Sequence, residues 1–216
     1  MPLLALVFAA AGAGIGFAAD RLAARWPAHE DGSVRRVDWR TGAAVITGAL
    51  GLGALPLRWS DPADLALLGA YFVALVVLMA TDLDQKLLPD VITIPMAVIA
   101  LVILGLTVTN LYMNPLLESK GAPLFTALAA GIGAPALLAG TSLVLRGGIG
   151  MGDLKLAISL GLMSGITRLF AGFLVASAAS SVVILALVAS RRIGFKSAIP
   201  FGPVLIAGGM IAALIQ

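Results

Sequence analysis

The amino-acid sequence predicts an all-α fold: a polytopic membrane helix bundle of about eight apolar segments, with seven or eight crossings and the N-terminus outside. Of the 216 residues, 60% are hydrophobic and only 12% are charged, against roughly 25% charged in an ordinary soluble domain. The mean hydropathy is +1.06. At about 20 apolar residues per crossing, the chain has space for these helices and for no large soluble domain. We therefore expect one membrane-embedded domain over residues 1–216.

Apolar segments follow one another along the chain and are separated by short polar stretches. They cover residues 3–19, 41–57, 65–81, 91–111, 124–145, 154–165, 169–190 and 201–215. The sixth segment has about 12 residues and would reach only about 18 Å at 1.5 Å per residue, which is too short to span a membrane unaided. We expect it to be a half-helix or to be fused with the segment that follows.

Lysine and arginine residues indicate the orientation of the bundle. No charged stretch precedes the first segment, and Arg21 and Arg25 follow it, which favours an uncleaved anchor with its N-terminus outside. With eight crossings, eleven of the 14 lysines and arginines then fall on the cytoplasmic side, as the positive-inside rule requires. This orientation predicts a short cytoplasmic loop at about residues 20–40 and places residues 79–95 and 146–155 on the same face.

The residue types that are missing limit the chemistry. The chain has no cysteine, which excludes disulfides, a cysteine-ligated zinc site and a thiol nucleophile, and its single histidine, His29, cannot build a metal site alone. We expect no metal and read His29 as a solvated loop residue. The net charge of +3 comes from basic residues between apolar runs, so we expect contact with membrane lipid and no nucleic-acid partner.

Two acidic stretches on the expected cytoplasmic face form the candidate site. Asp82 ends an apolar segment, and Pro89 forces the chain to turn soon afterwards. Asp153 follows Gly150 and Gly152, which permit a close turn, and it starts the next apolar segment, where a helix N-terminus favours a carboxylate. Either aspartate taken alone is most simply a solvated cap or a topology marker.

Together, two carboxylates at helix ends on one membrane face fit an aspartic protease, in which one takes a proton from water as the other polarises the scissile carbonyl. Because Asp82 lies near a helix C-terminus and Asp153 at a helix N-terminus, we expect Asp82 to carry the shared proton more often. The alternative is a cation- or proton-coupled membrane transporter, which places aspartates on broken helices near the midplane. No inverted repeat is apparent, which favours the peptidase.

Three motifs resemble those of the prepilin leader peptidases, which are membrane aspartic proteases of the Gly-X-Gly-Asp type. In the first motif, Asp82 is followed eight residues later by the aspartate of Leu-Pro-Asp, residues 88–90. The second motif, Gly-X-Gly-Asp-X-Lys, occupies residues 150–155, and the third, "IPFGP", occupies residues 199–203. The resemblance covers the chain from about residue 65 to the C-terminus.

This resemblance implies a role for each matching residue. The catalytic pair would be Asp82 and Asp153, and supporting or substrate-binding roles would fall to Asp90, Gly150, Gly152 and Lys155. The substrate would be the N-terminal leader of a type IV prepilin or a related pseudopilin. It would be cut just before its hydrophobic helix, at the cytoplasmic face of the inner membrane, and proteolysis would need no cofactor.

The first loop departs from the family pattern. Many bacterial members carry an extended loop there with paired Cys-X-X-Cys zinc ligands, and they also N-methylate the mature pilin with S-adenosylmethionine. In this chain the loop, residues 20–40, has about 21 residues and no cysteine. The peptidase interpretation does not depend on this loop. We expect S-adenosylmethionine as a cofactor only if methyltransferase activity is retained, and that activity is left open.

Other charged residues near the motifs have simpler interpretations. We expect Asp84 and Lys86 to be solvated loop charges, because interfacial charges cost little. Asp90 could cap the next helix, orient the loop or contact substrate. Lys155 could pair with a carboxylate, bind lipid headgroups or act as a positive-inside residue, and the Arg35-Arg36 pair is most simply a topology determinant near anionic lipid.

Overall fold

A computed structural model describes residues 2–26, 34–117, 123–144, 150–190 and 201–215. Within these ranges the chain forms seven helices and no strands. The helices are α1 (Pro2–Ala23), α2 (Trp39–Arg58), α3 (Pro62–Gln85), α4 (Asp90–Val108), α5 (Pro123–Val144), α6 (Met151–Ala189) and α7 (Gly202–Leu214).

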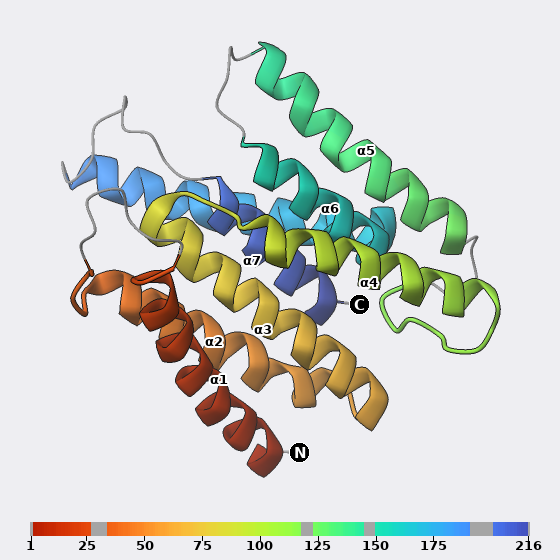
Figure 1. The fold of residues 1–216 in the computed structure, drawn as a ribbon, viewed down its shortest axis with the longest axis horizontal. Coiled ribbons are helices and arrows are strands. Elements are labelled where there is room, and N and C mark those ends of the chain that lie inside the picture. Colours follow the sequence, from red (N-terminus) through yellow and green to blue (C-terminus); the bar gives the residue numbers. More distant parts are fainter. Residues whose placement is uncertain (1, 27–33, 118–122, 145–149, 191–200, 216) are drawn as a thin grey trace.

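The predicted all-α membrane bundle is confirmed (Figure 1). Among the described residues, six helices, α1 to α6, are long and apolar enough to cross a membrane, and α7 is a shorter apolar helix of 13 residues. Helices α1 to α5 and the first half of α6 alternate in direction, and the chain turns back within α6 before α7 begins. The ends of α1 and α3 therefore lie at the same end of the bundle as the starts of α2, α4, α6 and α7. Both acidic stretches found in the sequence therefore lie at one end of the molecule.

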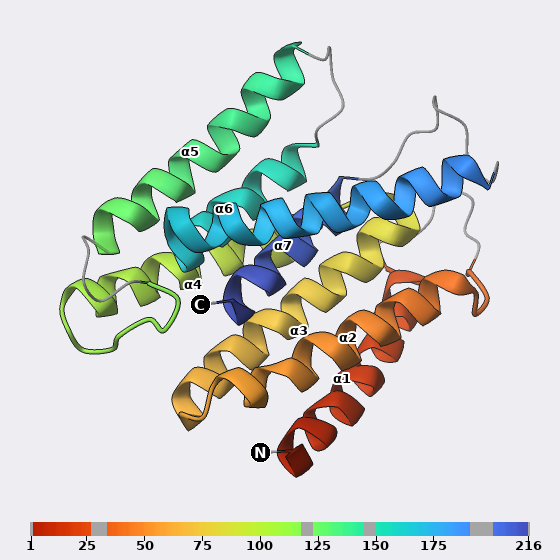
Figure 2. The same ribbon diagram turned by 180° about the vertical axis from the view of Figure 1, so that it is seen from behind.

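A kink at Gly165 accounts for the short sixth segment. This residue has φ 67° and ψ 177° inside α6, a left-handed conformation that glycine adopts without steric cost. The chain turns sharply there, and the two halves of α6 run in different directions (Figure 2). The sixth apolar segment is thus a short helix that continues into the seventh through a kink, which agrees in part with each of the two sequence expectations.

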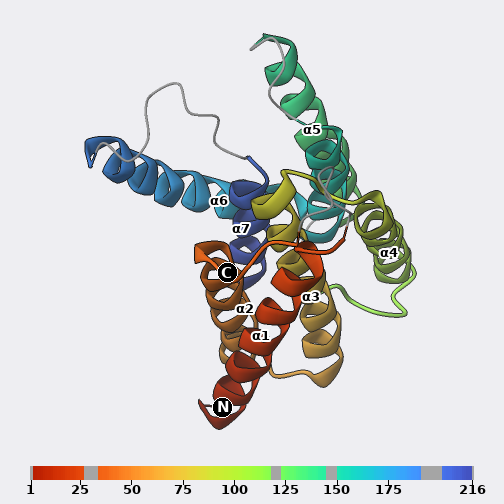
Figure 3. The ribbon, with the colours of Figure 1, turned by 60° about the vertical axis from the view of Figure 1, so that its left-hand side comes forward.

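Small residues bring neighbouring helices into close contact. A methyl group at Gly12 would lie 2.1 Å from the carbonyl oxygen of Gly48, and one at Gly16 would lie 2.3 Å from that of Ala44, so α1 and α2 touch backbone to backbone. The central helix is α3, on which Phe72 is fully buried. In contrast, α5 and the second half of α6 diverge (Figure 3) and expose apolar faces, as a lipid environment allows.

Trp59 fastens the opposite end of the bundle. Arg58 and Arg168 lie over its ring, 4.7 Å and 5.9 Å from the centroid, at cation–π distances. The indole Nε1 of Trp59 donates to the carbonyl oxygen of Ala213 at 3.0 Å, and Arg168 donates to that of Ile215 at 2.5 Å. These contacts hold the C-terminal end of α7 against α2 and α6.

Candidate active site

Asp82 lies in the last turn of α3. The helix continues to Gln85, and Lys86 ends it in the left-handed conformation with φ 55°. Asp82 is only 5% exposed, and its Oδ2 has no hydrogen-bond partner among the described residues. A buried carboxylate oxygen without a partner costs free energy, so this side chain is a functional candidate on structural grounds as well.

Asp153 lies in the first turn of α6, three residues after the N-cap Gly150. The backbone N–H of Gly150 donates to Oδ2 of Asp153 at 3.2 Å, an arrangement that caps the helix. Asp153 is buried, and its Oδ1 has no partner in the described part of the chain. The helix N-terminus stabilises the carboxylate form of this residue.

The structure brings the two motifs together at one place. Asp82 and Asp153 lie close enough for their negative charges to repel each other. Next to them, the turn between α3 and α4 packs on the start of α6. A methyl group at Gly152 would lie 2.8 Å from Cβ of Leu88. The glycine therefore permits a close approach that an alanine would prevent.

An ion pair ties the same two segments together. Nζ of Lys155 lies 2.7 Å and 2.6 Å from the two carboxylate oxygens of Asp90, the first residue of α4. Of the roles that the sequence leaves open, Lys155 thus pairs with a carboxylate and Asp90 joins the loop to α6. The Asp90 side chain is 56% exposed, which distinguishes it from the two buried aspartates.

The third motif reaches the site from α7. Gly202 is buried, and a methyl group at this position would lie 2.6 Å from Cγ of Asp82. Phe201 and Pro203 flank it, whereas Ile199 and Pro200 of the motif lie outside the described residues. The sequence alone predicts no contact for this motif, because its spacing does not indicate which helix Gly202 faces.

The prediction that Asp84 is solvated is wrong. Its side chain is 1% exposed and accepts hydrogen bonds from Arg35 at 2.5 Å and from Arg40 at 3.0 Å. Arg35 also pairs with Asp20 and with Asp38. The physical reason is that α3 extends beyond the predicted apolar segment, so Asp84 lies on a helix and not in a loop. The only signal for this burial in the sequence was the number of arginines in the first loop, and these arginines are equally well explained as determinants of membrane topology.

The ion cluster changes the pKa values of its members outside the spanning helices. Burial opposes the charge of Arg35, but its hydrogen bonds with Asp20 and Asp84 outweigh burial and raise the pKa of Arg35. Burial also opposes the charge of Asp38, but the Arg40 N–H and the Arg35 guanidinium lower the pKa of this carboxyl. The cluster thereby fastens the loop after α1 to the helix that carries Asp82.

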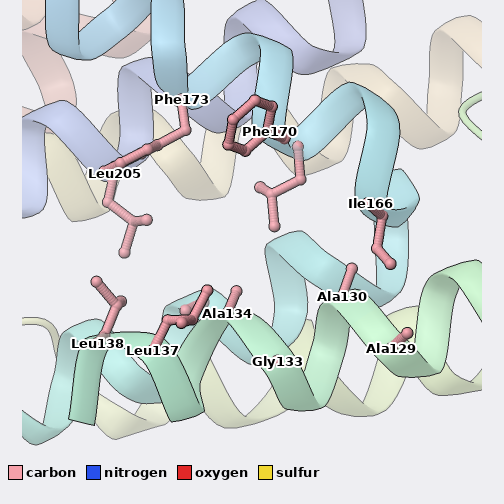
Figure 4. Close-up of a pocket in the computed structure, with 12 residues that line it drawn as sticks. Ala129, Ala130, Gly133, Ala134, Leu137, Leu138, Ile166, Phe170, Phe173 and Leu205 are labelled. Atoms are coloured by element: carbon pink, nitrogen blue, oxygen red, sulfur yellow. The ribbon is translucent and has the colours of Figure 1, made fainter. Parts of the chain in front are cut away.

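An apolar cavity of about 350 Å³ lies between α5 and α6 (Figure 4). Ala157, in its lining, is four residues from Asp153, and Leu205 is three residues from Gly202, so the cavity begins about one helical turn from the carboxylates. The lining residues are Ala129, Ala130, Gly133, Ala134, Leu137, Leu138, Ala157, Ile166, Leu169, Phe170, Phe173 and Leu205.

Among the described residues, no three His, Asp or Glu side chains gather in a way that could hold a metal ion. The fold and the site together define a class of protein. This is a polytopic membrane protein in which two buried carboxylates, from the end of one helix and the start of another, meet at one end of the bundle.

Comparison with known proteins identifies the family. The chain matches the type IV leader peptidase family over residues 69–188, a range that includes Asp82 and Asp153, and it belongs to this family. The resemblance inferred from the three motifs is confirmed.

Two relatives from Burkholderia pseudomallei, of strains 1026b and K96243, carry the name "Prepilin leader peptidase/N-methyltransferase". Each is 38% identical to this chain over 167 residues, which cover 76% of this chain and 51% of the relative. The chain thus spans about half the length of these relatives. No solved structure matches it.

Proposed function

We propose that this protein is an aspartic endopeptidase that removes the N-terminal leader of type IV prepilins or pseudopilins, with Asp82 and Asp153 as its catalytic pair. Family membership supports the reaction class and the substrate. The observation that carries the assignment of residues is the pair of buried carboxylates, each with one oxygen that has no partner in the described part of the chain. A water molecule and a scissile carbonyl are the groups that such oxygens can bind.

The surroundings of the two carboxylates favour different roles. Asp153 accepts the Gly150 N–H and lies at a helix N-terminus, both of which favour its charged form. Asp82 lies near a helix C-terminus, which favours its protonated form. In this mechanism Asp153 takes a proton from water, and the water oxygen attacks the carbonyl carbon while Asp82 donates a hydrogen bond to the carbonyl oxygen. The C–N bond then breaks as Asp153 passes the proton that it took from water to the leaving nitrogen.

We place this site at the cytoplasmic face of the inner membrane, with the N-terminus outside. The distribution of basic residues supports this orientation, because the site end of the bundle carries Arg21, Arg35, Arg36, Arg40 and Lys86. Membrane lipid surrounds the exposed apolar faces. Both carboxylates lie at helix ends, at one end of the bundle. This position and the family match together favour a peptidase over the cation- or proton-coupled transporter considered from the sequence.

The apolar cavity is where the substrate's hydrophobic segment would lie. In the proposed substrate this segment begins directly after the bond that is cut, so it must lead away from the two carboxylates into the membrane. The cavity begins about one helical turn from the carboxylates and extends between α5 and α6, and all its lining residues are apolar. Its volume of about 350 Å³ falls within the roughly 300–1,000 Å³ of ordinary binding pockets. It therefore has room for side chains from one face of an apolar helix.

The described residues do not fit S-adenosylmethionine in this cavity. All its lining side chains are apolar, so nothing there would bind the charged amino-acid part or the ribose of that cofactor. The chain also lacks the cysteines of the family's zinc loop. We therefore propose a peptidase whose N-methylation of the product is weak or absent. Mass spectrometry of cleaved substrate incubated with S-adenosylmethionine tests this, and stoichiometric N-methylation would refute it.

The test of proteolysis uses the purified protein in detergent and a membrane peptide with a basic leader, a glycine and then an apolar helix. We expect one cut directly after the glycine. Inhibitors of serine and thiol proteases and metal chelators should leave it intact. The transporter alternative is tested by measuring proton- or cation-coupled uptake into reconstituted vesicles. Uptake without cleavage would show that the protein is a transporter and not a peptidase.

A further inference from the structure

The start of α7 lies against the carboxyl group of Asp82. A methyl group at Gly202 would lie 2.6 Å from Cγ, 2.6 Å from Oδ2 and 2.9 Å from Oδ1 of that side chain. Non-bonded carbon atoms in proteins do not come this close to other heavy atoms unless one of the two is displaced. No side chain fits at position 202 while the Asp82 carboxyl stays where it is.

Space, and not backbone conformation, is what requires glycine here. Gly165 is the described glycine with a left-handed φ, and Gly202 does not share that conformation. An alanine at 202 would therefore meet no backbone strain. The three nearest described atoms that a methyl group at this position would meet all belong to the Asp82 carboxyl group.

α7 is held too firmly to move away from such a collision. A methyl group at Gly172 would lie 2.3 Å from the carbonyl oxygen of Gly208, so the second half of α6 touches the backbone of α7 directly. At the far end of α7, Trp59 and Arg168 bind the last carbonyl groups. Near its start, the rings of Phe201 and Phe173 lie 5.9 Å apart. With the helix fixed, the Asp82 carboxyl is the part that must turn.

We propose that Gly202 is a positioning residue for the reaction: its bare backbone forms the wall against which the Asp82 carboxyl is held toward Asp153. This inference rests on the proposed function, since it takes Asp82 to be a catalytic residue. It gives the third sequence motif a physical role. The proton-carrying carboxyl is oriented by the start of α7, while α3 only supplies it.

The primary test is Gly202→Ala, compared with Gly69→Ala in α3 and Gly105→Ala in α4. A methyl group at either control position meets nothing within 4 Å. We expect kcat for the membrane peptide to fall about 100-fold in Gly202→Ala, because a displacement of about 1 Å in a catalytic group has effects of this size. KM should stay within about twofold, and the pH profile of kcat should shift. Both control variants should cleave like the parent, and cleavage by Gly202→Ala within about threefold of the parent would overturn the proposal.

A second measurement decides the outcome if Gly202→Ala folds poorly. In an Asp82→Ala background the carboxyl is absent, so a methyl group at 202 has the space that it lacks in the parent. The proposal predicts that Gly202→Ala lowers the thermal unfolding midpoint in the parent and has no such effect in Asp82→Ala. An equal loss in both backgrounds would overturn it. This cycle needs no activity, so it still tests the contact if the parent cleaves nothing and the proposed function is what fails.

Discussion

Two sets of buried carboxylates lie at the same end of the bundle and have opposite surroundings. Asp20 and Asp84 have side chains that are 1% exposed, and arginines from the first loop and its neighbouring helices pair with both. Asp82 and Asp153 are also buried, yet they form no ion pair within the described residues, and each keeps one oxygen without a partner. The difference separates carboxylates that hold the fold together from carboxylates that are free to act on a substrate.

Helix geometry lets one helix supply both kinds. Residues two apart on an α-helix point about 200° apart around the axis, so Asp82 and Asp84 face opposite sides of the last turn of α3. Asp84 faces Arg35 and Arg40 of the first loop and α2, and Asp82 faces Asp153 and the start of α7. A buried charge without a counter-charge is costly, so it is kept where function needs it.

The difference between the two sets of carboxylates is tested most strongly by removing the charge of Asp82 or of Asp153. In Asp82→Asn and in Asp153→Asn, cleavage should fall by about 10³-fold or more, because general acid–base catalysis contributes about 10²–10⁴-fold and each residue is one half of the pair. The unfolding midpoint should stay the same or rise, since the mutual repulsion of the two carboxylates is removed. Cleavage assays and thermal unfolding in the same detergent measure both effects.

Asp61→Asn is the matched control for these two variants. Asp61 caps α3 at the opposite end of the bundle through hydrogen bonds from the N–H groups of Ala63 and Asp64, and asparagine caps helices about as well as aspartate. Its activity should match the parent. Full activity in either Asp82→Asn or Asp153→Asn would remove that aspartate from the mechanism.

Breaking the paired set should have the reverse effect, with stability lost and chemistry kept. Arg35 is 13% exposed at its side chain and contacts Asp20, Asp38 and Asp84. Its replacement leaves Asp20 paired with Arg21 and Asp84 with Arg40. Two buried carboxylates each lose one counter-charge, so Arg35→Ala should lower the free energy of unfolding by about 3 kcal/mol. The protein that remains folded should keep a kcat near that of the parent.

Arg36→Ala provides the comparison at the neighbouring position, where the residue is exposed. Urea unfolding of the two variants, followed by helical circular dichroism, separates a buried ionic role from a general effect of positive charge. Equal stability of Arg35→Ala and Arg36→Ala would show that the cluster contributes nothing to the fold. Loss of kcat in fully folded Arg35→Ala would show that the cluster also positions Asp82.

The sequence predicts the fold class from its composition. It also predicts the turns at the two motifs, because proline and glycine determine the backbone conformation locally. The end of α3 is different. Asp84 follows the apolar run, so hydropathy assigns it to a loop. Only its contacts with Arg35 and Arg40, which are distant in the sequence, explain why this charged turn is helical and its side chain buried. Gly202 illustrates the same limit, since no local pattern in the sequence indicates that α7 starts beside Asp82.

The sixth apolar segment shows an intermediate case. Its length of about 12 residues indicates that it is too short to span alone, but the sequence does not choose between a half-helix and a helix fused with the next one. The choice depends on Gly165, one of 25 glycines, and on its left-handed φ against Leu117 and Thr126. Glycine permits this conformation, and tertiary packing selects it.

Filling the apolar cavity should weaken substrate binding without touching either carboxylate set. Gly133→Leu adds a side chain inside the cavity lining, and Gly140→Leu adds the same side chain elsewhere on α5; a first carbon at either position meets nothing within 4 Å. We expect KM for the membrane peptide to rise about tenfold in Gly133→Leu, which corresponds to about 1.4 kcal/mol. Gly140→Leu should not change it.

A short leader peptide without the apolar segment is the matching substrate control. Gly133→Leu should cleave it as the parent does. If both peptides are affected equally, the cavity does not hold the hydrophobic segment, and if neither is affected, its ordinary occupant is lipid.

The ion pair between Lys155 and Asp90 should have the smallest effect, because it differs from both buried sets in its exposure. The side chains are 34% and 56% exposed, and exposed pairs contribute about 0–1 kcal/mol and weaken as salt is added. We expect Lys155→Met and Asp90→Asn each to reduce cleavage by no more than about fivefold, the equivalent of 1 kcal/mol. A double-mutant cycle measured at low and at high salt should give a small coupling that shrinks with salt. A loss of about 100-fold in one single variant, with no coupling to the other, would mean that this side chain contacts the substrate, and the exposed pair would then belong to the catalytic set.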